Sequence, residues 1–301
     1  MARVVVVGGG YGGLASALRL AKLGHDVTVV EEGELGGALA PVTSDGFSWD
    51  TATHTLVPGV VRDLFRKTGR PLERELDLVQ LDCLREHWFE DGTSLVLTAR
   101  RSEQLAAFDA LRPGLGTAYV DHVASYADPW EVLRREYAEV PWDPGHPSRA
   151  LASMFDGRES LARRLRKVAR DPRLTLVAGH PFVAEGHALR DVPAWAGVTA
   201  YLEQRFGAWA FVGGTAALRD ALVARLDTRR VAVVAARADD VVVRDGRAVA
   251  VTTTAGDLDA DVVVCAVDPR RLPVLASYVA RATPVIRHSP RHSSLAGELI
   301  G

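Results

Sequence analysis

Residues 3–22 read RVVVVGGGYGGLASALRLAK, and they place a cluster of glycines where an apolar run gives way to an amphipathic one. The run Arg3–Val7 is almost wholly apolar, which is typical of a parallel strand that is covered on both faces. The following segment has a helical period, and Gly24 is placed to end the helix. The apolar face of that helix consists of Leu14, Ala17, Leu18 and Ala21. A second apolar run, 27–30, completes a βαβ unit and predicts an α/β fold.

The spacing of three glycines predicts what this βαβ unit holds. Gly8 permits a tight turn, Gly10 lets the backbone approach a pyrophosphate, and Gly13 lets the helix pack close to the strand. The N-terminus of the helix then faces the anion. Glu31 ends the second strand at about the 20-residue spacing expected of a carboxylate that binds a ribose diol, and an acid there disfavours a 2′-phosphate. The pattern favours an adenine dinucleotide over a tight turn that binds nothing.

The length, charge and cysteine content of the chain argue against several classes of function. The 301 residues are enough for two domains, and a net charge of −2 gives no electrostatic reason to expect nucleic acid. Cys83 and Cys265 form no CxxC pair, which indicates a reducing cytoplasm rather than a disulfide or zinc scaffold. Cys83 and His87 are four residues apart but have no third metal ligand near them. No charged leader and no apolar stretch of about 20 residues is present, so no membrane span is expected.

A second glycine pair, Gly36-Gly37, follows in EGELGGALAPVTSDGFSWDTATHTLVP, and a plain NAD domain rarely needs it. Further along, the chain contains FGAWAFVGGTAALRDALVARL and later LDADVVVCAVDP. Together these segments resemble the two-dinucleotide-binding flavoproteins, and more narrowly the phytoene desaturase and amine oxidase superfamily. That family has a GxGxxG unit, a glutamate, a GGR segment, an F-x-D-x-G segment and a GG-x-x-x-L helix.

The resemblance implies FAD as the cofactor, bound in an extended form. It implies that Gly8, Gly10, Tyr11, Gly12 and Gly13 line the pyrophosphate, that Glu31 holds the adenosine ribose, and that Gly36 and Gly37 pass close to the cofactor. It also implies that Ala52, Thr53 and His54 lie near the flavin and that the backbone at Ala238 meets the adenine. The sequence shows no pair of titratable groups with a common location, so no residue is assigned as a catalytic acid or base.

The resemblance also implies a domain organisation. We expect a Rossmann-like FAD-binding domain of the two-dinucleotide-binding type in residues 1–71 and 207–269, with an inserted α+β substrate domain in residues 72–206 and 270–301. Hairpins are predicted at Asp91-Gly92 in the insertion and at Asp245-Gly246 in the nucleotide domain.

Three departures from the family pattern weaken the expected FAD binding. Ala38 replaces the arginine after the glycine pair, and Ala52 replaces the glycine of the F-x-D-x-G segment. The chain also stops without the C-terminal glycine-rich segment of the family. We therefore expect either a truncated relative or a partner chain or oligomer that supplies the remainder of an incomplete substrate domain.

The function implied by the resemblance is an FAD-dependent oxidoreductase that removes hydride from a small apolar substrate of isoprenoid or carotenoid type. Two alternatives remain open within the family: a catalytically inactive nucleotide-binding relative and an amine-oxidase-like flavoenzyme. A third alternative, an NAD-binding dehydrogenase, shares the first βαβ unit but not Gly36-Gly37. No nucleic acid partner is expected.

The segment DGRESLARRLRKVARDP is the clearest amphipathic helix in the insertion. Asp156 and Glu159 have capping-box spacing, and Asp171-Pro172 is expected to end the helix. Its apolar stripe is Leu161, Leu165 and Val168, and its other face carries Arg163, Arg164, Arg166, Lys167 and Arg170. That basic face is either a solvated surface or a patch that contacts anionic lipid at a membrane periphery.

Overall fold

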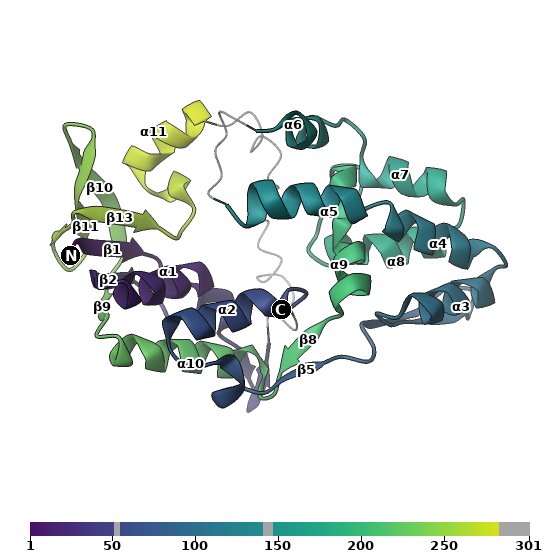
Figure 1. Cartoon of the computed structure of the whole chain (residues 1–301), viewed down its shortest axis with the longest axis horizontal. Coiled ribbons are helices and arrows are strands. Elements are labelled where there is room, and N and C mark those ends of the chain that lie inside the picture. Colours follow the sequence, from purple (N-terminus) through teal and green to yellow (C-terminus); the bar gives the residue numbers. More distant parts are fainter. Residues whose placement is uncertain (51–54, 141–146, 283–301) are drawn as a thin grey trace. The chain divides into compact units, whose positions relative to one another are not determined.

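A computed structural model of the chain describes residues 1–50, 55–140 and 147–282. The described chain forms two compact units (Figure 1), each with its own apolar core. The first unit comprises Met1–Gln80 and Trp209–Ala282, and the second unit contains Leu81–Ala208.

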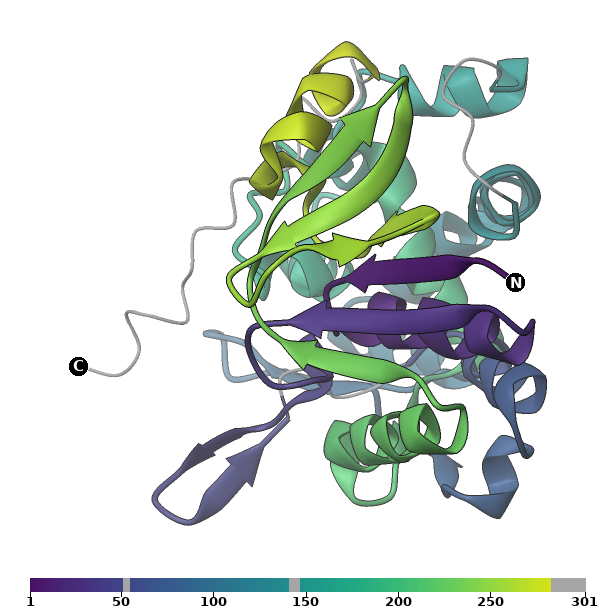
Figure 2. The same cartoon turned by 90° about the vertical axis from the view of Figure 1, so that its left-hand side faces the viewer.

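The first unit is built on a parallel sheet in the order β13-β1-β2-β9. Its strands are Val262–Cys265 (β13), Arg3–Val7 (β1), Asp26–Glu31 (β2) and Ala232–Ala235 (β9). Figure 2 shows β1, β2 and β9 side by side with their arrowheads pointing the same way. The helix α1 (Tyr11–Lys22) connects β1 to β2, so the predicted βαβ unit is confirmed.

Both faces of this sheet are covered, as the apolar run of β1 predicts. On one face, Val4 and Val6 pack with Leu14 and Leu18 of α1 and with side chains of α2 (Pro58–Thr68) and α10 (Gly214–Thr228). On the other face, Val5 and Val7 pack against a three-stranded antiparallel sheet. That sheet contains β10 (Ala238–Arg244), β11 (Arg247–Thr253) and β12 (Leu258–Asp259).

The turn between β10 and β11 is the predicted hairpin. Asp245 and Gly246 have φ values of 50° and 74°, the left-handed pair that a two-residue hairpin turn requires. A shorter hairpin joins β3 (Val42–Ser44) to β4 (Phe47–Trp49) after a 3₁₀ turn at Gly37–Leu39.

The limits of the first unit differ from the expected domain limits in three places, one of which is that residues 207–208 fall in the second unit. Residues 72–80 belong to the first unit because β5 (Leu78–Gln80) pairs antiparallel with β8 (Trp209–Phe211). Residues 270–282 belong to it because α11 (Pro273–Ala282) begins with Val274 N donating to the Asp240 carboxylate, 3.0 Å away. The assignment of these units as nucleotide and substrate domains stays a prediction.

The second unit is mainly helical and begins with the hairpin of β6 (Arg85–Trp88) and β7 (Ser94–Leu97), which confirms the Asp91-Gly92 turn. Its first helices are α3 (Arg101–Leu111), α4 (Leu115–Ala124) and α5 (Ala127–Leu133), the last extended by a π-helical turn at Arg134–Ala138. It continues with α6 (Arg149–Phe155), α7 (Leu161–Val168), α8 (Pro172–Val183) and α9 (Val198–Phe206), with a 3₁₀ turn at Ala194–Gly197 before α9. The core includes Phe108 stacked on Tyr119, with ring centroids 4.1 Å apart.

The amphipathic helix of the second unit is α7, and it begins and ends at different residues from those expected. Its N-cap is Ser160, whose hydroxyl accepts from Arg163 N, whereas Asp156 lies at the C-cap of α6. The helix ends at Val168, and Asp171 instead caps the N-terminus of α8. The predicted stripe is confirmed, with Leu161 and Leu165 in the core and Val168 packed against it.

None of the helices in the described ranges combines the length and the apolar composition needed to cross a bilayer.

Acid is expected to destabilise the second unit through His122, which is buried on α4 with its ring edge against Tyr126. Burial, together with the charge of Arg164, lowers the pKa of His122 to about 4. The unfolded chain therefore binds this proton over the window from about pH 6.5 to 4 in which the folded chain excludes it. The contribution of His122 to the free energy of unfolding should be fully present above that window and be lost across it, a change of about 3 kcal/mol. Urea unfolding across this range should show a smaller loss for His122→Phe than for the wild type, and equal losses would contradict the assignment.

Candidate dinucleotide-binding site

The loops that follow the parallel strands meet at one edge of the first unit. Val7 and Cys265 end their strands in register with each other, and Glu31 and Ala235 end theirs in register one residue further along. The predicted glycine loop follows β1, and Gly36-Gly37 follows β2. Ligands of parallel α/β sheets bind outside the carboxyl ends of the strands, so the topology places these motifs where a ligand is expected.

The geometry of the first glycine loop fits the roles expected of its glycines. Gly8 has a φ of 102°, and a Cβ there would lie 2.7 Å from Val267 Cγ1. A Cβ on Gly13 would overlap the carbonyl oxygen of Gly8, so only glycine lets α1 begin this close to β1. By contrast, a Cβ on Gly10 would meet no atom within 4 Å. Gly10 therefore lies on the open side of the loop, where the backbone is accessible to a ligand.

The N-terminus of α1 is left open for an anion. Gly10 is its N-cap and supplies no side-chain cap, and the first turn contains no acidic residue. Backbone N–H groups at a helix start carry the positive end of the helix dipole, roughly half a unit charge. Tyr11 and Gly12 belong to this turn, and burial raises the pKa of the Tyr11 phenol, which stays neutral at pH 7. A diphosphate matches this set of donors.

Glu31 lies beside the loop at the end of β2. Its Oε2 accepts a hydrogen bond from Gly9 N at 2.7 Å, and its Oε1 accepts one from Gly33 N at 2.9 Å. The carboxylate thus holds the glycine loop against the segment that follows β2. Two oxygens of a carboxylate offer about four acceptor positions, so ribose hydroxyls can still bind to Glu31.

The second glycine pair packs directly on the first loop. Gly36 N donates to Gly9 O at 2.7 Å, and Gly36 and Gly37 have φ values of 113° and 54°. A Cβ on Gly37 would lie 3.1 Å from Gly10 Cα, and one on Gly36 would lie 2.5 Å from Arg219 Cγ. Glycine is therefore required at these two positions because Gly37 packs closely on the first loop and Gly36 packs closely on α10.

Asp50 is a structural residue of this region that the sequence interpretation missed. Its Oδ1 accepts from Thr215 Oγ1 at 2.9 Å, and its Oδ2 accepts from Thr215 N at 3.1 Å. Gly213 and Gly214 precede Thr215 with φ values of 87° and 76°, and a Cβ on Gly214 would overlap Asp50 Oδ2. The glycine pair of the GG-x-x-x-L helix thus allows Asp50 to cap α10. No local signal reveals this contact, because 165 positions separate the two residues.

Four further residues were expected to contact the cofactor, and the structure describes only one of them, Ala238. Ala52, Thr53 and His54 lie outside the described residues. Just after them, Thr55 N donates to Trp209 O at 2.8 Å, which ties this segment to the start of β8. Ala238 begins β10 opposite Thr253, three residues beyond the end of β9. Its backbone is thus near the carboxyl edge, and its contact with adenine stays a prediction.

Cys83 and His87 belong to the second unit. Within the described ranges, no three His, Cys, Asp or Glu side chains gather in a group that could hold a metal ion.

A family model described as flavin-containing amine oxidoreductase matches residues 11–294 of the chain. Among curated proteins, 4,4′-diapolycopene oxygenase of Methylomonas is 29% identical over 97% of this chain and 61% of its own length. Carotenoid 3,4-desaturase of Haloarcula japonica is 26% identical over 73% of this chain and 46% of its own length. The chain therefore spans at most about three fifths of the length of these relatives.

Two solved structures share the fold at low identity. An oxidoreductase from Methanosarcina mazei has a TM-score of 0.60 and 18% identity, over 92% of this chain and 61% of its own. Putrescine oxidase has a TM-score of 0.61 and 19% identity, over 90% of this chain and 60% of its own. These likenesses confirm the Rossmann-like flavoprotein fold, and the flavin of the family description agrees with FAD as the expected cofactor. With nearly the whole sequence matched, the chain belongs to the flavin-containing amine oxidoreductase family.

Proposed function

We propose that this chain carries the FAD site of an oxidoreductase that removes hydride from an apolar, isoprenoid or carotenoid-like substrate. The observation that carries the proposal is the open N-terminus of α1 beside the glycine loop, with the Glu31 carboxylate at the end of the neighbouring strand. The names of the Methylomonas and Haloarcula relatives support a carotenoid-type substrate.

When FAD is bound, its flavin ring supplies the hydride acceptor. The residues of this chain bind and orient the cofactor. The backbone of Gly10, Tyr11 and Gly12 donates to the diphosphate, and Glu31 accepts from the adenosine ribose while it holds Gly9 in place. Gly36 and Gly37 let the segment after β2 pack against this loop, and the hydrogen bond from Gly36 N to Gly9 O helps to hold the loop in place.

The relatives contain more chain than this one matches, so we propose that further polypeptide completes the substrate domain. A partner chain or a second copy would serve that purpose. Purified protein that is yellow, and whose flavin is bleached by an alkene substrate, would exclude the inactive relative. Bleaching by putrescine but not by a carotenoid would instead favour an amine substrate, the alternative supported by the structural likeness to putrescine oxidase.

The cofactor proposal is tested by calorimetric titration of the full chain with FAD, NADH and NADPH. We expect FAD to bind most tightly. Glu31→Gln should weaken FAD binding about tenfold, because it removes the charge from hydrogen bonds to Gly9, Gly33 and the ribose. Glu32→Gln, on the exposed neighbour, is the matched control and should bind FAD as the wild type does. Tight binding of NADH without affinity for FAD would overturn the proposal.

A further inference from the structure

An open cleft with a volume of about 620 Å³ lies in the second unit between α7 and the N-terminal end of α8. Four cationic side chains line it: Arg163, Arg166, Lys167 and Arg170. All four are exposed to solvent. We call it the α7–α8 cleft, and it is made wholly of residues within the second unit.

The cations of the α7–α8 cleft are gathered on one side of a short helix. Arg163, Arg166 and Lys167 follow helical spacing, while Leu161 and Leu165 bury the opposite side in the core. Like charges at this spacing repel one another and destabilise a helix. Arg166 and Lys167 lie in the last turn of α7, where the helix dipole favours cations and offsets part of this repulsion. The charge that remains is available to an anionic ligand.

Carboxylates neutralise only part of this charge. Glu159 accepts from Lys167 Nζ at 2.6 Å and from Arg164 Nε at 3.1 Å. Within residues 1–50, 55–140 and 147–282, no carboxylate forms an ion pair with Arg163, Arg166 or Arg170.

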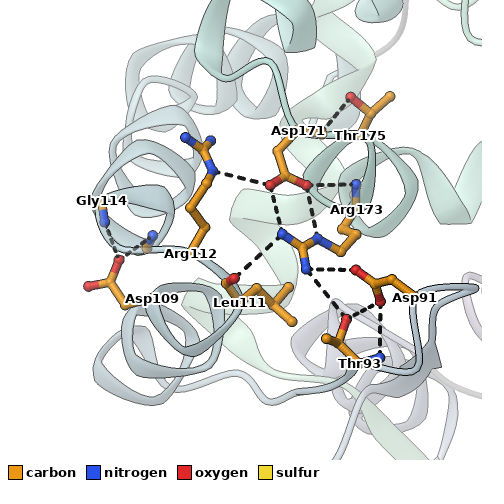
Figure 3. Close-up of polar contacts among 10 residues, drawn as sticks. Asp91, Thr93, Asp109, Leu111, Arg112, Gly114, Asp171, Arg173 and Thr175 are labelled. Carbon is orange, nitrogen blue, oxygen red and sulfur yellow. Dashed lines mark hydrogen bonds and ion pairs between the residues drawn. The ribbon is translucent and has the colours of Figure 1, made fainter.

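The acid that lines the cleft, Asp171, is already balanced by other cations. Figure 3 shows its carboxylate between the side chains of Arg112 and Arg173. Arg112 Nε donates to Asp171 Oδ2 at 3.2 Å, and Arg173 Nη2 donates to the same oxygen at 3.0 Å. The hydrogen bond from the Arg173 side chain is the main cause that holds the pKa of Asp171 below its usual value, and Arg112 adds to it. Asp171 also caps α8, because its Oδ1 accepts from Arg173 N. Arg112 and Arg173 thus offset Asp171, and Arg173 also pairs with Asp91 at 3.0 Å. Asp171 is therefore already paired and does not neutralise Arg163, Arg166 or Arg170.

We propose that the α7–α8 cleft binds a phosphate-bearing anion through Arg163, Arg166 and Arg170. Guanidinium groups suit this ligand because their planar forks donate pairs of hydrogen bonds to phosphate oxygens. A free diphosphate compound and the headgroup of an anionic lipid offer the same chemistry. The residues of this site belong to the second unit, and those of the proposed flavin diphosphate site at the N-terminus of α1 belong to the first.

The test titrates the full chain with inorganic pyrophosphate by calorimetry and, separately, with phosphatidylcholine vesicles that contain phosphatidylglycerol. Pyrophosphate binding that is weakened about 100-fold in Arg163→Gln/Arg166→Gln/Arg170→Gln supports a site for free anions, because three charge-assisted contacts are lost. Vesicle binding that the same triple variant loses supports a site for lipid headgroups, and hence contact with a membrane surface.

Two controls locate the effect. Arg135→Gln/Arg149→Gln/Arg190→Gln removes the same charge from exposed positions of the second unit and should bind either probe as the wild type does. Gly13→Val disturbs the flavin loop in the first unit, which also offers donors to a diphosphate, and should leave intact the part of the binding that the cleft triple variant removes. Both triple variants should retain the wild-type circular dichroism spectrum. The proposal is overturned by the absence of binding to both probes, by equal losses in the two triple variants, or by binding that only Gly13→Val removes.

Discussion

Gly13→Val is expected to abolish FAD retention by the purified chain. The Cβ alone would overlap the Gly8 carbonyl oxygen, and it would also lie 3.3 Å from the Ala266 side chain. Neither neighbour is the flexible end of a side chain, so α1 must move away from β1 or the glycine loop must change shape. Either movement takes the N–H groups of the first turn away from the position in which they receive a diphosphate.

Overpacking of this kind costs a few kcal/mol, and a loss of that size in the free energy of FAD binding weakens binding by about 100-fold. The measurement is the flavin absorbance that remains after gel filtration, followed by calorimetry with added FAD. Gly59→Val is the matched control, because Gly59 lies exposed in α2 and a Cβ there would meet no atom within 4 Å. A folded Gly13→Val protein that binds FAD as tightly as Gly59→Val would refute the assigned role of Gly13.

The β1-α1-β2 unit could be predicted nearly to the residue because its signals are local. The strand run, the glycines and the helix period are contiguous, and the structure has β1 at Arg3–Val7 and α1 from Tyr11. The family patterns identified the flavin cofactor for the same reason. The strand, the glycine turn and the helix each depend on the backbone preferences of neighbouring residues, so a short stretch of sequence is enough to predict them.

The start of α7 shows how a tertiary contact overrides a local signal. Asp156 and Glu159 have the spacing of a capping box, but Ala194 N donates to Glu159 O at 2.8 Å and Leu161 N donates to Val192 O at 2.8 Å. These bonds hold residues 159–161 extended against a distant segment, and the helix starts after Ser160 instead. The capping of α10 by Asp50 and the pairing of β5 with β8 were missed for the same reason, because each joins parts of the chain far apart in sequence.

The buried side chain of Arg225 has partners of several kinds in the first unit. It is 6% exposed, and its guanidinium lies 4.1 Å from the centre of the Phe65 ring. Its Nη2 and Nε donate to the two oxygens of Glu75 at 2.7 and 3.1 Å. Its remaining donors reach Thr68 Oγ1 and the carbonyl oxygens of Phe65 and Arg70. One side chain thus joins α10 to the C-terminal end of α2 and to the segment that follows it.

Arg225→Met is therefore expected to lower the free energy of unfolding by about 3–5 kcal/mol, because it leaves the half-buried Glu75 carboxylate and the carbonyl oxygens without their donor. Equilibrium urea unfolding at pH 7 measures the change. Arg66→Met is the matched control, since Arg66 pairs with Asp63 on the surface with 72% of its side chain exposed and should lose no more than about 1 kcal/mol. Arg225→Lys keeps the charge but not the planar fork, so its loss should fall between the two. Equal stability of Arg225→Met and Arg66→Met would show that α10 is held to α2 by apolar packing alone, through Leu218, Leu222 and Leu226.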